Sequence, residues 1–114
     1  MDVKDYRLRN DNGNIVFEGY TGTDERFRMP DGVTEIAERA FAGNKCLKHI
    51  DLGDVVTVGG FAFQECSNLE TVVMERASVI GAGAFEFCSS LRSISINNVT
   101  GFDDSDIIIF IYKL

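Results

Sequence analysis

Three cysteines are the residues best suited to chemistry in this chain of 114 residues. Cys66 and Cys88 are 22 positions apart, whereas Cys46 follows a different spacing. The chain has no Cys-x-x-Cys pair, and an odd number of cysteines does not suit a disulfide framework. Free cysteine is among the most buried residue types, so we expect structural thiols rather than disulfides.

A zinc site would need more ligands than the sequence brings together. Cys46 and His49 have the Cys-x-x-His spacing of half a site. Structural zinc takes four ligands, and no second pair stands at ligand spacing. The Asp-Asn-Gly-Asn segment at residues 11–14 and the acidic stretch at residues 103–106 also lack the spacing of a calcium loop. The sequence therefore predicts no metal and no cofactor.

The sequence also contains little that indicates a catalytic site. His49 is the only histidine, so any nucleophile activated by histidine would have to lie beside it. Ser67, Ser89 and Ser90 have a structural explanation as turn residues that hydrogen-bond the backbone. No Gly-x-Ser-x-Gly elbow, Gly-x-Gly-x-x-Gly loop or P-loop occurs. We predict that the protein is not an enzyme.

The charge balance and the apolar runs exclude further classes of ligand. Eighteen acids against eleven bases give a net charge of −7, and the pI is about 4.5. Phosphate recognition depends on Lys and Arg, so we expect no direct binding of nucleic acid or of an anionic membrane surface. The longest apolar run, residues 107–112, is far shorter than the roughly 20 residues of a membrane helix. Residues 1–7 are charged and lack a signal-peptide core, so we expect a cytoplasmic protein, or else the trimmed product of a longer one.

The elements that position these side chains repeat with a period of 22 positions. Three copies cover residues 33–54, 55–76 and 77–98, and each copy has an Ala-Phe pair followed six residues later by a leucine. The invariant columns are Ala40/Ala62/Ala84, Phe41/Phe63/Phe85 and Leu47/Leu69/Leu91, and apolar character is kept at Ile36/Val58/Ile80, Ile50/Val72/Ile94 and Leu52/Met74/Ile96. A unit of this size cannot bury its apolar side chains alone, so the copies must stack on one another.

Each unit divides into a strand and a return segment. The segment that begins at Leu47, Leu69 or Leu91 reads L-x-x-I-x-I with conservative replacements, and its alternation predicts a strand with one buried face. The other half is too short and too rich in glycine for a helix of its own, so we expect a short extended piece and a turn. The predicted fold is a single domain over residues 1–114. It is mainly β with short helical or turn segments, a solenoid with a parallel sheet along one side.

The repeats resemble the BspA-like leucine-rich repeat family, whose units contain A-F-x-x-C followed by S-x-L. Residues 62–69 and 84–91 match this signature, and the likeness extends over residues 29–98. Three departures stand out: Asn44 replaces the cysteine of the first copy, Ala37 replaces a glycine, and a proline follows the strand only at Pro30. The resemblance implies a non-catalytic binding scaffold, and members of the family are often exported to bacterial surfaces.

The ends of the stack need caps, because a terminal repeat would otherwise expose its apolar face. In the N-terminal cap, residues 1–32, the sequence predicts a hairpin over 6–17 that turns at Asn12-Gly13. Residues 25–29 alternate like an additional first rung. In the C-terminal cap, residues 99–114, the run 107–112 predicts a strand with two apolar faces. Such a strand needs cover, and we expect it to pair with its counterpart in a symmetric homodimer or with a strand of the target.

The outward side of the predicted sheet is the candidate binding surface. Repeat proteins commonly bind partners along such a surface, and the exposed columns here are mostly polar, which suits a protein partner. The candidate residues, including two from the C-terminal strand, are Lys48, His49, Asp51, Glu70, Thr71, Val73, Glu75, Arg92, Ser93, Ser95, Asn97, Ile109 and Ile111. We predict a protein–protein interaction module. The alternative is a small acidic inhibitor, of the kind that phages use against host defence, that occludes a nucleic-acid-processing enzyme.

Overall fold

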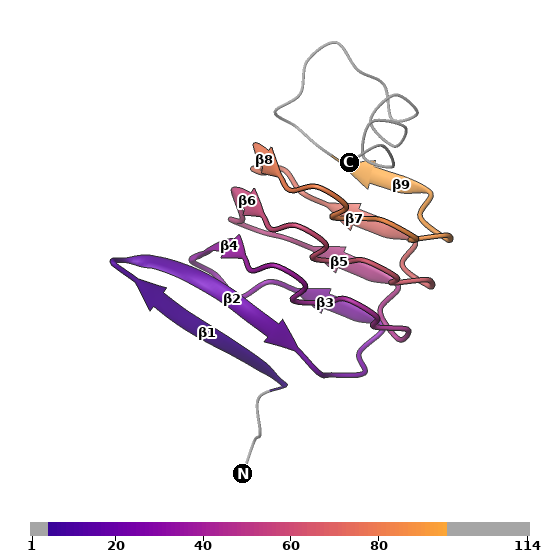
Figure 1. Ribbon diagram of the computed structural model, residues 1–114, viewed down its shortest axis with the longest axis horizontal. Helices are drawn as coiled ribbons and strands as arrows, with labels where there is room; N and C mark the ends of the chain where they lie inside the picture. The colour runs from indigo at the N-terminus through magenta and orange to yellow at the C-terminus, as the bar shows by residue number, and fades with distance from the viewer. Residues whose placement is uncertain (1–4, 96–114) are drawn as a thin grey trace.

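A computed structural model describes residues 5–95, which form two sheets joined by turns (Figure 1). Successive repeats place one strand in each sheet, so the chain winds between the sheets as it advances along the molecule. The first sheet has the order β1–β2–β4–β6–β8, with strands Tyr6–Asp11, Asn14–Tyr20, Val33–Ile36, Thr57–Val58 and Val79–Ile80. The second has the order β3–β5–β7–β9, with strands Arg26–Arg28, His49–Asp51, Thr71–Val73 and Ser93–Ser95.

The second sheet is the parallel sheet that the repeat predicts. Strands β5, β7 and β9 pair in parallel, and the register sets each residue opposite the one 22 positions later. Strand β3 adds a fourth rung at an offset of 23, with Arg26 opposite His49. The additional first rung predicted at residues 25–29 is therefore confirmed. The middle residue of each strand points into the core, as the alternation requires.

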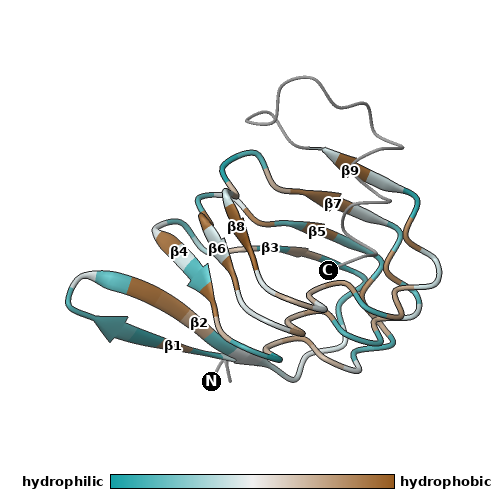
Figure 2. Cartoon of the chain, turned by 45° about the horizontal axis from the view of Figure 1, so that its top comes forward, coloured by the Kyte–Doolittle hydropathy of each residue, from teal (hydrophilic) through white to brown (hydrophobic). Residues whose placement is uncertain are grey.

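The first sheet begins with the predicted N-terminal hairpin. Strands β1 and β2 are antiparallel, and Asn12 and Gly13, both with positive φ, form the turn between them. Strand β2 also pairs in parallel with β4, so the hairpin joins the repeats at the edge of this sheet. Strand β1 is mostly hydrophilic, with Leu8 as its aliphatic residue, whereas the middle of β2 is hydrophobic and covers the first repeat (Figure 2).

The sequence predicts one sheet, and the structure has two. Strands β6 and β8 contain only two residues each, too few for an alternating pattern to show. Their hydrogen bonds arise because stacking brings the same short segment of each repeat alongside the next. Between residues 5 and 95 the remaining segments are turns and loops rather than helices. The predicted C-terminal strand lies outside the described residues.

The core between the sheets is organised around a column of phenylalanines. Phe17, Phe41, Phe63 and Phe85 stack with ring centroids 5.1, 4.8 and 5.2 Å apart, and all four rings are buried. Phe17 belongs to the hairpin, so the cap supplies the ring that a preceding repeat would have contributed. The stacked rings and the leucine columns beside them form one continuous core.

The turns of neighbouring repeats approach one another closely. A Cβ atom on Gly81 would lie 2.8 Å from the carbonyl carbon of Gly59 and from the Cα of Gly60, which leaves no room for a side chain. Ala37, in the equivalent position of the first copy, meets the hairpin instead of a repeat, and its N–H donates to Phe17 O at 2.9 Å. This difference in neighbour explains why only the first copy departs from glycine.

Candidate protein-binding face

Two rows of side chains run across the outward face of the second sheet, which we call the outer face. The parallel register fixes both rows, because outward residues of neighbouring strands lie opposite one another. One row contains Arg26, His49, Thr71 and Ser93, and the other contains Arg28, Asp51, Val73 and Ser95. Six of the candidate residues from the sequence therefore lie side by side here.

A groove of about 370 Å³ lies on the outer face over the first three strands. Its outward side chains come from both rows: Arg26, Arg28, His49, Asp51, Thr71 and Val73. The imidazole Nδ1 of His49 is 2.7 Å from the hydroxyl oxygen of Thr71. Asp51 Oδ1 accepts the backbone N–H of Gly53 at 2.9 Å. These bonds hold the floor of the groove in place while the two arginines remain exposed.

Arg26 and Arg28 are groove residues that the repeat columns did not predict. The additional residue at Pro30 shifts the first rung to an offset of 23, so the arginines do not fall in the 22-residue columns. The alternating pattern of residues 25–29 was the signal that could have found them. Since alternate residues of a strand share a face, burial of Phe27 requires both arginines to point outward.

Charged side chains pair along the margin of the outer face. Lys48 Nζ lies 3.7 Å from a carboxylate oxygen of Glu25, and Arg92 lies 3.2 Å from one of Glu70. Lys48, Glu70 and Arg92 stand at the same position of successive repeats and alternate in charge. The structure brings Glu70 and Arg92 together but joins Lys48 to Glu25 of the preceding rung. Exposed pairs of this kind contribute a fraction of a kcal/mol each.

The remaining candidate residues do not belong to this groove. Glu75 is exposed and follows β7, beyond the end of the strand. Asn97, Ile109 and Ile111 lie outside the described residues.

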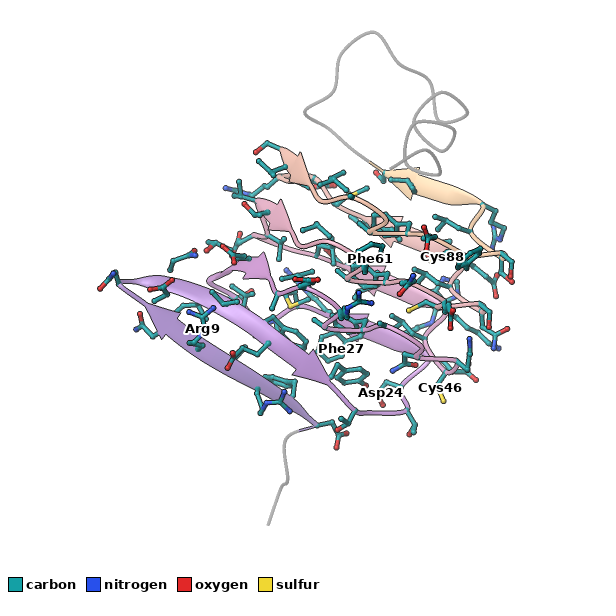
Figure 3. All side chains as sticks on the ribbon, in the orientation of Figure 1. Arg9, Asp24, Phe27, Cys46, Phe61 and Cys88 are labelled. Atoms are coloured by element: carbon teal, nitrogen blue, oxygen red, sulfur yellow. The ribbon has the colours of Figure 1, made fainter. Side chains whose placement is uncertain are left out.

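The cysteines are separated as their spacing predicts. Cys66 and Cys88 are buried, and their thiols donate to the carbonyl oxygens of Phe41 and Phe63 at 3.1 and 3.0 Å. Burial raises the pKa of Cys66 from 9.0 to about 11. Burial, with a smaller contribution from Cys66, raises the pKa of Cys88 to about 12. Cys46 is exposed on a turn at the edge of the molecule (Figure 3).

Asn44 takes the place of cysteine in the first copy. Its amide Nδ2 donates to Gly22 O at 3.1 Å, so it too bonds a carbonyl of the preceding rung. Its Oδ1 accepts the N–H groups of Cys46 and Leu47 at 2.9 and 3.1 Å. The Asn44 side chain is longer than that of cysteine, and its hydrogen bonds connect the N-terminal cap to the turn that contains Asn44.

Metal ligands do not cluster between residues 5 and 95. No group of three or more His, Cys, Asp or Glu side chains there could hold a metal ion. The same residues include no helix that is long and apolar enough to span a membrane.

Comparison with known proteins shows where this architecture belongs. A leucine-rich repeat protein of Treponema pallidum superposes with a TM-score of 0.71 and 31% identity over 78% of this chain and 45% of its own. A leucine-rich cell surface protein of Faecalibacterium prausnitzii A2-165 gives a TM-score of 0.72 and 24% identity over 84% of this chain and 31% of its own. The chain therefore spans less than half the length of either protein. None of the curated proteins matches.

The sequence itself matches a family of the same kind. Residues 13–106 fit the family described as BspA type leucine rich repeat region (6 copies). The match starts inside the hairpin and includes all four rungs of the second sheet. The chain therefore belongs to the BspA-type leucine-rich repeat family.

Proposed function

We propose that this protein is an interaction module that binds a protein partner across the outer face. Leucine-rich repeat families typically form protein-interaction modules without catalytic activity, which supports this class of function. The observation that carries the proposal is the groove over β3, β5 and β7. It joins side chains of three successive rungs into one surface.

The chemistry of the groove supports a protein partner rather than a lipid. Arginine, histidine, threonine and aspartate offer donors and acceptors, and the apolar part of the lining comes from Val73, Phe27 and Ile50. Interfaces between proteins combine polar and apolar contacts of this kind. The groove is open along the sheet, which suits an extended segment of a partner better than an enclosed small molecule.

The arrangement of charge favours this function over the acidic inhibitor. A mimic of nucleic acid would present a surface of negative charge to its target enzyme. The groove on the outer face instead has two arginines, Arg26 and Arg28, against one acid, Asp51, and the cations along the margin are paired with acids.

A pair of matched substitutions tests the proposed surface. Thr71 and Thr57 are both half-buried outward residues, one from each sheet. Thr71→Trp would place a large ring in the groove, whereas Thr57→Trp would place it on the opposite sheet. Each immobilised variant would be exposed to an extract of the source cells, and retained proteins would be measured by mass spectrometry.

We expect at least one protein to be retained by the unchanged chain and by Thr57→Trp but lost with Thr71→Trp. Circular dichroism must show that both variants fold. Equal retention by all three chains, or equal loss with both variants, would contradict binding at the outer face.

A further inference from the structure

Arg26 and Arg28, the two arginines of the groove, have few acidic side chains paired with them, although the protein is acidic overall. Among residues 5–95, Arg26 forms no ion pair, and Arg28 has only a distant one, 4.0 Å from Asp31. Three nearby acids have other partners: Glu25 pairs with Lys48, Glu70 pairs with Arg92, and Asp24 accepts the Tyr20 hydroxyl. Asp51, which lies opposite Arg28 in the register, is the one acid that lines the groove. The groove therefore has a net positive charge in a chain of net charge −7.

The spacing of the arginines fits a particular form of anionic ligand. Alternate residues of a strand lie about 6.6–6.8 Å apart on one face, so Arg26 and Arg28 present two guanidinium groups at this interval. An extended peptide presents its own alternate side chains at the same interval. Guanidinium groups bind carboxylates through paired N–H donors.

We propose that the groove binds an extended protein segment with carboxylates at alternate positions, one for Arg26 and one for Arg28. This inference rests on the proposed function and names the chemistry of the partner. His49 lies opposite Arg26 in the same row, Thr71 lies opposite His49, and both contribute polar contacts to the segment. Val73 lies in the row of Arg28 and faces an apolar side chain of the segment.

Fluorescence polarisation with two labelled nine-residue peptides tests the inference. Both peptides contain three glutamates among threonine and valine, at every second position in one and at every third in the other. Only the first sets its carboxylates on one face of an extended chain. We expect it to bind the unchanged protein more tightly, and to bind less tightly as salt rises from about 0.1 to 1 M, because salt screens exposed charges.

Two double variants separate the groove from charge in general. Arg26→Gln with Arg28→Gln should weaken binding of the alternating peptide by roughly tenfold. Arg7→Gln with Arg9→Gln removes two arginines at the same spacing from β1, which lies in the other sheet, and should change binding less than roughly twofold. All four positions are exposed, and circular dichroism would check that both variants fold.

Equal affinity for the two peptides, no binding of either peptide, or equal losses in the two double variants would overturn the inference. The proposed function has its own test. If Thr71→Trp abolishes retention of a partner while the alternating peptide fails to bind, the outer face remains the interface and only the acidic segment is excluded.

Discussion

The two buried thiols both have hydrogen-bond partners inside the core. Each sulfhydryl donates to a phenylalanine carbonyl of the preceding repeat. Since burial raises both pKa values, Cys66 and Cys88 should remain protonated at neutral pH. At pH 8 we expect one thiol per chain, Cys46, to react rapidly with Ellman's reagent, and all three to react in denaturant. Rapid reaction of a second thiol in the folded protein would contradict the arrangement.

The same thiols predict a loss of stability in alkali. Both thiols have a higher pKa in the folded protein, about 11 and about 12, than the value of 9.0 that applies to the unfolded chain. Each thiol therefore contributes its full stabilisation below pH 9.0, and this contribution is lost as the pH rises through the folded pKa values. We expect the free energy of unfolding to fall between pH 9 and 12 by at most about 7 kcal/mol, since each tenfold change in an acid dissociation constant corresponds to about 1.4 kcal/mol. The double variant Cys66→Ala with Cys88→Ala should show a flatter dependence on pH. Burial also raises the pKa of Tyr20, but this effect is present in both the unchanged protein and the double variant. An unchanged slope in urea titrations would exclude the thiols as its cause.

Gly83 combines two reasons to be glycine. Its φ is +65°, and a Cβ atom there would lie 2.5 Å from the Phe61 ring, whose own stacking partner is the Arg39 guanidinium at 4.7 Å. Gly43 also has a positive φ, of +76°, but open space around it. Gly43→Ala should therefore cost about 1 kcal/mol for backbone strain alone, and Gly83→Ala about 1–3 kcal/mol more because the ring must move. Equal losses in urea unfolding would show that Phe61 moves aside freely.

At the scale of the element, the fit between neighbouring turns limits what each turn can contain. Gly81 packs against the Gly59-Gly60 backbone, which cannot give way as a flexible side chain can. A Cβ atom on Gly60, in the preceding repeat, would have only the carbonyl oxygen of Ala82 nearby, at 3.4 Å. We expect Gly81→Ala to lower the free energy of unfolding by at least about 2 kcal/mol and Gly60→Ala by less than about 1 kcal/mol. A mild effect of Gly81→Ala would mean that the repeats separate without difficulty.

The second sheet could be predicted from the sequence because its signals are strong. The leucine and isoleucine columns fix strands β5, β7 and β9, and their constant spacing also fixes the register. The hairpin could be predicted because Asn12-Gly13 favours a two-residue turn.

The first sheet and the full groove could not be predicted in the same way. Strands β6 and β8 contain too few residues to show alternation, and they pair only because the repeats stack. The binding surface predicted from the sequence did not include Arg26 and Arg28, because one additional residue before β4 moves them out of the repeat columns. The salt bridge from Lys48 to Glu25 was missed for the same reason.

At the scale of the whole molecule, stability depends on contacts between neighbouring repeats. Phe63 stacks between Phe41 and Phe85 and is fully buried, so Phe63→Ala should lower the free energy of unfolding by about 3–5 kcal/mol through lost burial and an internal cavity. Phe87 is 63% exposed, and Phe87→Ala provides the control, with an expected change below about 1 kcal/mol. Urea unfolding followed by circular dichroism would measure both. A loss below about 1 kcal/mol for Phe63→Ala would be incompatible with the stacked core.

The constant register between repeats has a consequence for how such a chain can change in length. Strands β5, β7 and β9 each meet a neighbour displaced by 22 positions, and β4, β6 and β8 follow the same rule. A duplicated copy of residues 55–76 would keep the surfaces that the flanking repeats already contact, and only the junction between the two copies would be new. Unequal recombination could therefore add or remove a whole turn in one step at the cost of a single new junction between repeats. A gain or loss of one residue within a strand would instead turn core side chains toward solvent.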